Sequence, residues 1–361
     1  MLRYVEGKDV LCYGAGKYGK IVYSYLKQNK LEPQGFIVSN KIDTKGPFGK
    51  VVYELDDIGN DTSKCILITV SDRFVDEIVS IVRGKCKLDY FIVNEHIMSE
   101  IKEEVISKNT QLQAVEMDRS RCFILGTGPT IKKQNLKKLK KEVVFSCSFC
   151  SLLDEYKDID PLFYVTPALT NDREGPDYCV EKMRFLNDTV TSPFIIADYE
   201  DYSLIVGNGF FCEKKLFFVD QSCSEWTDLF ERTCDLTQAT PAIQSSSIMM
   251  IKVALYIGFR DIYLLGLEHD FMENESYEHA YDFNRLGKCG YEKLMHMMSI
   301  HNSKGEGVKF SYESRINVYS TLIHQYRALK KISHDRGTNV YNSSLYSKLG
   351  VFEMKNLEDI S

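Results

Sequence analysis

Two stretches of the chain have the same order of elements: a short apolar strand, a glycine turn and a helical pattern. The first covers residues 10–28 and the second covers residues 122–139. Further apolar runs of strand length alternate with helical patterns between and beyond them. Because parallel strands need crossover connections that are usually helices, this alternation predicts an α/β fold with two Rossmann-like domains and mainly parallel sheets.

Length and composition indicate how the chain is divided. With 361 residues, of which 44% are hydrophobic, it is long enough for two globular domains. We expect a Rossmann-like nucleotide-binding domain at residues 1–106 and a second domain at residues 119–361. Residues 107–118 between them are mainly charged and polar, which is typical of a linker.

Charge and hydropathy argue against two kinds of partner. The formal net charge is -6 and the sequence pI is about 5.8, whereas binding to a phosphate backbone needs a basic face. We therefore expect no nucleic acid partner. No stretch has the pattern of a secretory signal, and no apolar run approaches the roughly 18 residues that cross a bilayer, so the expected location is the cytoplasm.

The first glycine turn contains Gly14, Gly16 and Gly19. The first two glycines let the backbone turn sharply and approach a ligand, and Gly19 lets the helix pack closely on the strand. A nicotinamide site also needs a carboxylate at the end of the second strand, where this chain has Ser39 and Asn40. A turn that only builds the sheet is the alternative.

The first domain resembles the Rossmann-like sugar-nucleotide-binding domain of bacterial polysaccharide-biosynthesis proteins. The shared segments are "YGAGKYGK", "GFIVSN" and "VVYELDDI" followed by "ILITVSD". This resemblance implies that the domain binds a nucleotide sugar or has a purely regulatory role.

The second glycine turn consists of Gly126, Thr127, Gly128, Pro129 and Thr130. Because proline fixes the entry into the predicted helix, we expect the amides of Gly128, Thr130 and Ile131 to face an anion such as phosphate. The helix is rich in lysines, which we interpret as a solvated face with only Lys132 near the turn.

Residues 240–271 hold the strongest indication of a site. Ser245 or Ser246 is positioned to cap a helix that Gly258 ends. The buried strand after it, at residues 261–267, delivers Glu268, His269 and Asp270 at its carboxyl end, where ligands bind in open α/β sheets.

These elements resemble the sialyltransferase-like glycosyltransferases of bacterial polysaccharide synthesis. That family includes the CMP-sialic-acid-dependent enzymes of lipooligosaccharide assembly and a domain related to hydroxymethylpterin diphosphokinase. The matching segments are "ILGTGPTI", "VFSCSF", "FYVTPAL", "SSSIMMIKVALYIGFRDIYLLGLEHDF", "YEHAYDF" and "VYNSSLYSKLGVF". The resemblance implies that the donor nucleotide lies at Gly126, Thr127, Gly128, Pro129 and Ser245 or Ser246. Thr127 and Ser148 stand where many relatives have asparagine.

Sugar transfer needs a base for the acceptor hydroxyl and donors for the departing phosphate. We expect His279 to be the base and His269 to position a substrate, because histidine titrates near neutral pH. Tyr277 and Tyr281 flank His279 and either donate to the phosphate or pack a lid. Asn342, after the last strand, either touches the donor or caps a turn.

The expected function is transfer of a sugar from a nucleotide donor, with CMP suspected, to a glycan hydroxyl. We expect no metal and no further cofactor, and we interpret Cys147 and Cys150, which have CxxC spacing, as buried thiols. Association with membranes through a lipid-linked acceptor and a homo-oligomer are further expectations. The alternatives are an ATP-dependent diphosphokinase-like enzyme and a non-catalytic accessory protein that binds nucleotide sugars.

Overall fold

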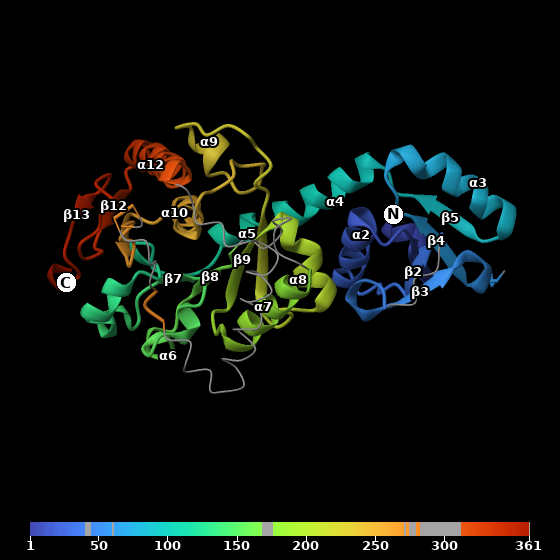
Figure 1. The fold of residues 1–361 in the computed structure, drawn as a ribbon, viewed down its shortest axis with the longest axis horizontal. Coiled ribbons are helices and arrows are strands. Elements are labelled where there is room, and N and C mark those ends of the chain that lie inside the picture. Colours follow the sequence, from blue (N-terminus) through green and yellow to red (C-terminus); the bar gives the residue numbers. More distant parts are fainter. Residues whose placement is uncertain are drawn as a thin grey trace. The chain divides into compact units, whose positions relative to one another are not determined.

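The computed structural model describes residues 1–39, 45–59, 61–167, 176–270, 272–273, 279–281 and 312–360 (Figure 1). Two compact units are present. Unit 1 contains residues 1–105 and 200–212, and unit 2 contains residues 106–199 and 213–361. Each unit is built around its own parallel sheet, so the predicted α/β class with two mainly parallel sheets is confirmed.

The sheet of unit 1 has five parallel strands in the order β3-β2-β1-β4-β5. The strands are β1 (Asp9–Tyr13), β2 (Gly35–Val38), β3 (Val51–Glu54), β4 (Lys64–Ile68) and β5 (Asp89–Ile92). The helices are α1 (Leu2–Val5), α2 (Lys17–Gln28), α3 (Val75–Lys85), α4 (Glu95–Ser107) and α8 (Tyr202–Asn208). This strand order is that of dinucleotide-binding sheets, whose crevice lies where the order reverses, here between β1 and β4.

The glycine turn of unit 1 is closely packed at two of its three glycines. A Cβ on Gly19 would lie 1.9 Å from the carbonyl oxygen of Gly14, which itself has φ +111. By contrast, a Cβ on Gly16 would meet no atom within 4 Å. Close approach of helix to strand therefore requires Gly19, and Gly16 is the position where the turn has open space beside it.

Helix α8 belongs to unit 1 although it lies between two strands of unit 2 in sequence. Lys27 Nζ donates to the carbonyl of Gly207 at 2.9 Å, and Tyr202 Oη donates to Gln28 Oε1 at 3.0 Å. The phenyl ring of Phe48 lies where a side chain on Gly207 would be. These contacts attach the segment 200–212, which the sequence assigned to the second domain, to the surface of α2.

The sheet of unit 2 has eight parallel strands in the order β10-β9-β8-β7-β6-β11-β12-β13. Its strands are β6 (Arg121–Leu125), β7 (Val144–Cys147), β8 (Phe163–Val165), β9 (Phe194–Asp198), β10 (Lys215–Val219), β11 (Asp261–Leu265), β12 (Asn339–Asn342) and β13 (Glu353–Met354). From β6 the chain builds outward to β10 and then returns to the other side of β6 with β11. The strand order therefore reverses between β6 and β11.

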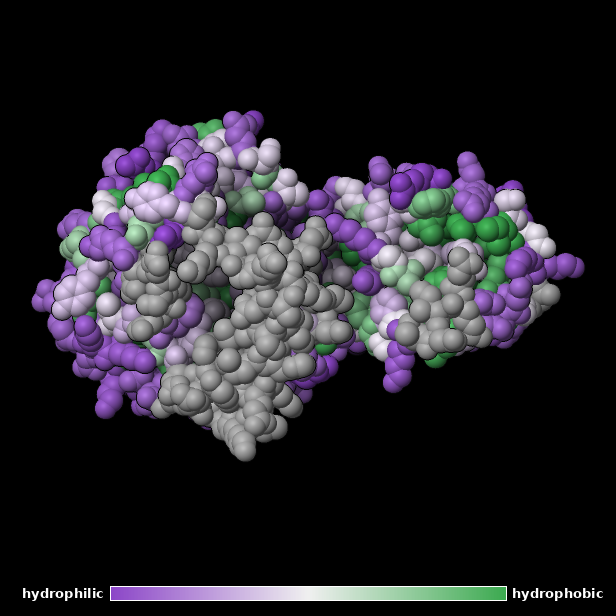
Figure 2. Space-filling view, viewed as in Figure 1, coloured by the Kyte–Doolittle hydropathy of each residue, from purple (hydrophilic) through white to green (hydrophobic). Residues whose placement is uncertain are grey.

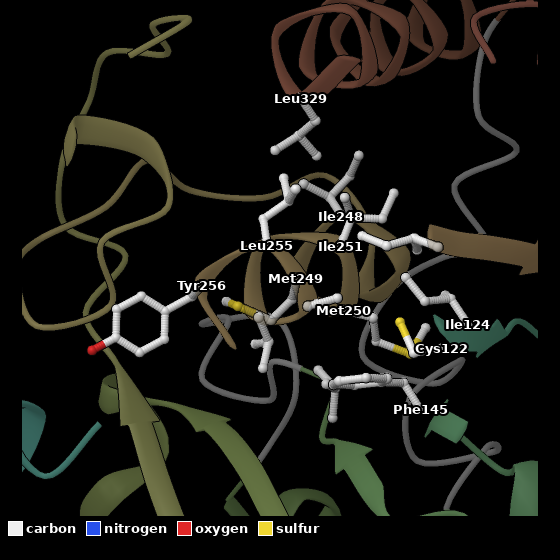
Figure 3. Close-up of a cluster of buried hydrophobic side chains, with 14 of the residues drawn as sticks. Cys122, Ile124, Phe145, Ile248, Met249, Met250, Ile251, Leu255, Tyr256 and Leu329 are labelled. Atoms are coloured by element: carbon white, nitrogen blue, oxygen red, sulfur yellow. The ribbon is translucent and has the colours of Figure 1, made fainter. Parts of the chain in front are cut away.

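The helices of unit 2 are α5 (Thr110–Gln113), α6 (Tyr156–Ile159), α7 (Pro176–Thr189), α9 (Phe230–Thr233), α10 (Ser246–Ile257) and α12 (Tyr312–Asp335). Every residue of α10 from Ser247 to Ile257 is buried, as expected for a helix that is apolar all round. Figure 3 shows α10 between Leu329 of α12 and the sheet residues Cys122, Ile124 and Phe145. Packing on two sides holds the start of this helix at a fixed place above the sheet.

The predicted helix after Pro129 is not present. Residues Pro129–Lys133 and Leu136–Leu139 form two short 3-10 turns instead. Ile131, Leu136 and Leu139 are all buried, and the five-residue step from Ile131 to Leu136 does not keep both on one face of an α-helix. Burial of these three side chains therefore favours the turns over the helix.

The surface differs between the parts of the chain. Hydrophobic side chains gather on the visible face of unit 1 over α3 and β5, whereas the visible face of unit 2 is mainly hydrophilic (Figure 2). The exposed large apolar residues of unit 1 are Val51, Phe74 and Ile92. None of the helices described is both long enough and apolar enough to cross a membrane.

Candidate active site

A pocket of about 170 Å³ lies in unit 2 where β6, β7 and β11 end and α10 begins. Six residues to which the sequence analysis gave a binding or catalytic role line it: Gly126, Thr127, Ser148, Ser245, Ser246 and His269. They come from four separate segments of the chain. The pocket also lies at the point where the strand order reverses, which is where open α/β sheets bind their ligands.

Glycines let the ends of β6 and β11 approach each other beside this pocket. A Cβ on Gly126 would lie 2.5 Å from the carbonyl oxygen of Gly266. Gly266 has φ +64, and a Cβ there would lie 2.6 Å from Ile131. The glycine turn after β6 is thus required for packing at the point where the strand order reverses, whatever it binds.

The carboxylate of Glu268 fills the second glycine turn. Its Oε1 accepts hydrogen bonds from the amide of Thr130, at 3.0 Å, and from the Thr130 hydroxyl. A Cβ on Gly128 would lie 1.3 Å from Glu268 Oε2. Glu268 is buried and also lines the pocket.

The amides that were expected to face a phosphate have acceptors within the protein in this structure. Gly128 N–H donates to the Gly266 carbonyl, Thr130 N–H to Glu268, and Ile131 N–H to the Gly128 carbonyl. A phosphate placed there would compete with these acceptors and be repelled by the carboxylate. Gly128, Pro129 and Thr130 lie outside the lining of the pocket.

The start of α10 offers a second place for an anion. Ser245 is the N-cap and its Oγ accepts from the amide of Ser247 at 3.4 Å. The hydroxyls of Ser245 and Ser247 are hydrogen-bonded at 2.8 Å. The amide of Ile248 also donates to Ser245, through its carbonyl. Because the helix dipole is positive at this end, the serine-rich start attracts negative charge.

His269 faces the same pocket from the end of β11. Its Nε2 is 2.9 Å from the hydroxyl of Tyr326, a fully buried residue of α12. Burial lowers the pKa of His269 to about 4, so its imidazole is neutral at neutral pH. Among the residues the structure describes, Nδ1 has no hydrogen-bond partner.

Two residues of the pocket have a backbone conformation that non-glycine residues rarely adopt. Ser148 and His269 both have φ +52. The Ser148 carbonyl accepts from Tyr164 Oη at 2.6 Å, which holds that peptide in place. Strain of this kind costs of order 1–3 kcal/mol per residue and often occurs at functional sites, where it aims a side chain.

His279 and Tyr281 lie next to the pocket lining. His279 Nδ1 is 3.0 Å from Thr127 Oγ1, and the His279 ring stacks on Tyr281 with centroids 4.7 Å apart. Burial lowers the pKa of His279, and a hydrogen bond to the Thr127 backbone partly offsets this. Tyr281 is buried against Phe149. Tyr277 lies outside the described residues.

Asn342 does not line the pocket. Its Nδ2 donates to the Leu349 carbonyl at 3.0 Å, and its Oδ1 accepts from the Ser344 amide at 3.1 Å. Both halves of the buried amide are thus used to close the loop after β12. The turn-capping alternative fits these contacts.

Sequence reasoning assigned no role to three residues of this site. Glu268, Ser247 and Tyr326 make the contacts given above. Ser247 belongs to a run of three serines, which was a usable signal. Tyr326 gave no signal because its spacing within α12 is that of an ordinary core residue.

The described residues contain no group of three or more histidine, cysteine, aspartate or glutamate side chains placed to hold a metal ion. Cys147 and Cys150 are both buried, and the Cys150 thiol lies 3.7 Å from the Leu125 carbonyl. Cys147 forms part of the pocket wall as a small apolar group.

Comparison with known proteins gives a likeness of fold. No protein-family model matches the chain, and no curated protein sequence matches it. The structure of the sialyltransferase CstII from Campylobacter jejuni in complex with a substrate analogue, cytidine-5'-monophosphate, is 18% identical with a TM-score of 0.38, covering 66% of this chain and 86% of that chain. The sialyltransferase CST-II in complex with trisaccharide acceptor and CMP is 17% identical with a TM-score of 0.36, covering 65% and 85%.

Proposed function

We propose that the protein is a glycosyltransferase that moves a sugar from a CMP-activated donor, of the sialic-acid type, to a glycan hydroxyl. One observation carries this proposal: a neutral histidine and a serine-capped helix start line one pocket where the strand order reverses. The histidine supplies a proton acceptor, and the helix start supplies hydrogen-bond donors for a departing phosphate.

In this proposal the donor phosphate binds at the start of α10. There Ser245 and Ser246 line the pocket, and the positive end of a 12-residue helix favours an anion. This favourable interaction is worth about 0.3–1 kcal/mol at an exposed site and more in a partly buried one. The hydrogen bond from the Thr130 amide to Glu268 supports this choice over the glycine turn after β6.

The base is His269 in this proposal, and not His279 as the sequence interpretation preferred. His269 lines the pocket directly, and its Nδ1 remains available among the described residues. His279 is engaged with Thr127 through Nδ1 and stacked on Tyr281, so it acts by holding Thr127, which borders the pocket. A bound phosphate raises the pKa of a nearby imidazole and makes His269 a better base in the complex than in the free protein.

The choice of CMP as the nucleotide rests on the resemblance of "ILGTGPTI" and "SSSIMMIKVALYIGFRDIYLLGLEHDF" to the sialyltransferase-like enzymes. The pocket is consistent with a monophosphate donor, because serine hydroxyls and helix amides are sufficient to hold the single charge of a phosphodiester. No metal ion is assigned a role.

Hydrolysis of CMP-N-acetylneuraminic acid by the purified full-length protein tests the proposal, with release of CMP as the signal and water as the acceptor. We expect CMP release by the wild type and a loss of about 100-fold or more in His269→Gln. His279→Gln is the matched control and should retain more activity than His269→Gln. ATP-dependent stabilisation without any response to CMP would favour the diphosphokinase alternative instead.

A further inference from the structure

A continuous chain of four hydrogen-bonded side chains joins the histidine of the pocket to the helix start of the same pocket. His269 Nε2 is 2.9 Å from Tyr326 Oη, which is 2.7 Å from Ser247 Oγ, which is 2.8 Å from Ser245 Oγ. Three of its members, His269, Ser245 and Ser247, line the pocket. The fourth, Tyr326, lies in the core.

The two middle residues are sealed from water. The exposed fraction of Tyr326 is 0% and that of Ser247 is 1%. The Tyr326 ring is held edge-on by His269, at 5.5 Å between centroids, and by Phe352, at 5.8 Å. Buried hydroxyls are costly unless bonded, and in a dry environment a chain of hydroxyls polarises along its whole length.

We infer that Tyr326 and Ser247 form a proton relay that returns the proton taken by His269 to the departing phosphate at Ser245. This inference rests on the proposed glycosyltransferase function. Both act through the two end residues in this relay. Tyr326 lies outside the pocket lining and is a positioning residue, whereas Ser247 is itself part of the lining.

The proton count of the relay balances. Before reaction, His269 Nε2–H donates to Tyr326, Tyr326 O–H to Ser247, Ser247 O–H to Ser245, and Ser245 O–H to a phosphate oxygen. As the acceptor oxygen forms its bond to the sugar, its proton moves to His269 Nδ1, and the electron pair of the breaking sugar–oxygen bond stays on the phosphate. Each link then passes one proton onward, so the phosphate gains one and His269 stays neutral with its proton on Nδ1.

The chain is suited to this role because every member is both donor and acceptor. A hydroxyl accepts one proton as it gives another away, and neutral imidazole has one nitrogen of each kind. Return of the proton through the protein also keeps His269 uncharged, which its buried position favours.

Kinetics of donor hydrolysis test the relay. In Tyr326→Phe and in Ser247→Ala we expect kcat for CMP-N-acetylneuraminic acid to fall about 10- to 100-fold, with KM changed less than about threefold. The loss of kcat in the variants should become smaller below about pH 6, where solvent can protonate the phosphate of the departing CMP. Tyr256→Phe removes a buried hydroxyl of α10 outside the pocket and should leave kcat unchanged. Wild-type kcat in both relay variants would overturn the inference.

Nitrogen NMR of the histidine rings tests the same chain without catalysis. Ser247→Ala does not touch His269, so a shift of the His269 ring signals in this variant requires coupling through Tyr326. We expect the His269 signals to shift in Ser247→Ala. Adding Ser247→Ala to Tyr326→Phe should cause no further shift of these signals. Unchanged His269 signals in Ser247→Ala would overturn the relay. Absence of CMP release by the wild type, in contrast, would overturn the proposed function.

Discussion

Glu268 Oε2 lies 1.3 Å from the place that a Cβ on Gly128 would occupy. A carboxylate from the end of β11 thus fills the turn after β6, and glycine at position 128 is the only residue that leaves room for it. This contact locks the two strand ends between which the strand order reverses. It also moves the expected phosphate position from the glycine turn to the start of α10.

Gly128→Ala should destabilise the protein by about 1–3 kcal/mol in the free energy of unfolding, the usual range for overpacking. The backbone at Gly128 has φ -67 and ψ 147, which alanine adopts freely, so the whole effect comes from the collision with Glu268. Urea unfolding measures it. Gly350→Ala is the control, because a Cβ there meets no atom within 4 Å. Equal stability of Gly128→Ala and the wild type would show that Glu268 moves aside at no cost.

Glu268→Gln should bind CMP more tightly than the wild type. The substitution keeps an acceptor for Thr130 but removes a negative charge from the pocket wall, and at an effective dielectric constant near 20 such a change is worth about 1 kcal/mol or more. Titration calorimetry should therefore give a dissociation constant about fivefold lower. Glu358→Gln, a change at an exposed ion pair with Lys138, is the control. Weaker binding in Glu268→Gln would mean that the carboxylate contacts the ligand favourably.

His269 makes stability fall as the pH decreases. Its pKa is about 4 in the folded protein against about 6.5 in an unfolded chain, so between these values the unfolded chain binds more protons. The contribution is present above about pH 6.5 and is lost as the pH falls toward 4. Between pH 7 and pH 5 the wild type should lose about 2 kcal/mol more than His269→Gln in urea unfolding. A parallel pH profile for both proteins would contradict this.

Lys252 makes a second pH-dependent contribution to the free energy of unfolding, and this one acts at alkaline pH. It is fully buried on α10, where Nζ donates to Thr240 Oγ1 at 2.8 Å and lies over the Trp226 ring, and burial lowers its pKa to about 8. Between pH 8 and 10.5 the unfolded chain binds the extra proton, so folding gains stability as the pH rises. From pH 7 to pH 9 the wild type should gain about 1 kcal/mol relative to Lys252→Met. No difference between the two slopes would show that the ammonium is charged at pH 9.

The sheet of unit 2 could be predicted because its central strands are buried on both faces. Such strands form continuous apolar runs, as in Phe123–Leu125 and Ile262–Leu265, and glycine or serine follows where they end. Two edge strands were not predicted: β5 in the sheet of unit 1, which is only half-buried, and β13 in the sheet of unit 2, which has two residues. Weak burial leaves no periodic pattern to detect.

The pocket was partly predictable for the same reason. Residues that follow buried strands, such as Ser148 and His269, must meet at one edge of a parallel sheet. The contacts that define its chemistry depend on tertiary approach: Tyr326 reaches His269 only because α12 packs over α10, and Glu268 enters the turn only because β11 lies beside β6. Nothing in the local sequence around Gly128 indicates that its amides are already used.

A crystal structure of the full-length protein grown with CMP tests the central claim most directly. Our account predicts the phosphate within hydrogen-bond distance of Ser245 and the first amides of α10, with His269 facing it across the pocket and Glu268 still in the glycine turn. CMP bound inside the turn at Gly128, with Glu268 displaced, or a pocket that stays empty at millimolar CMP, would contradict it.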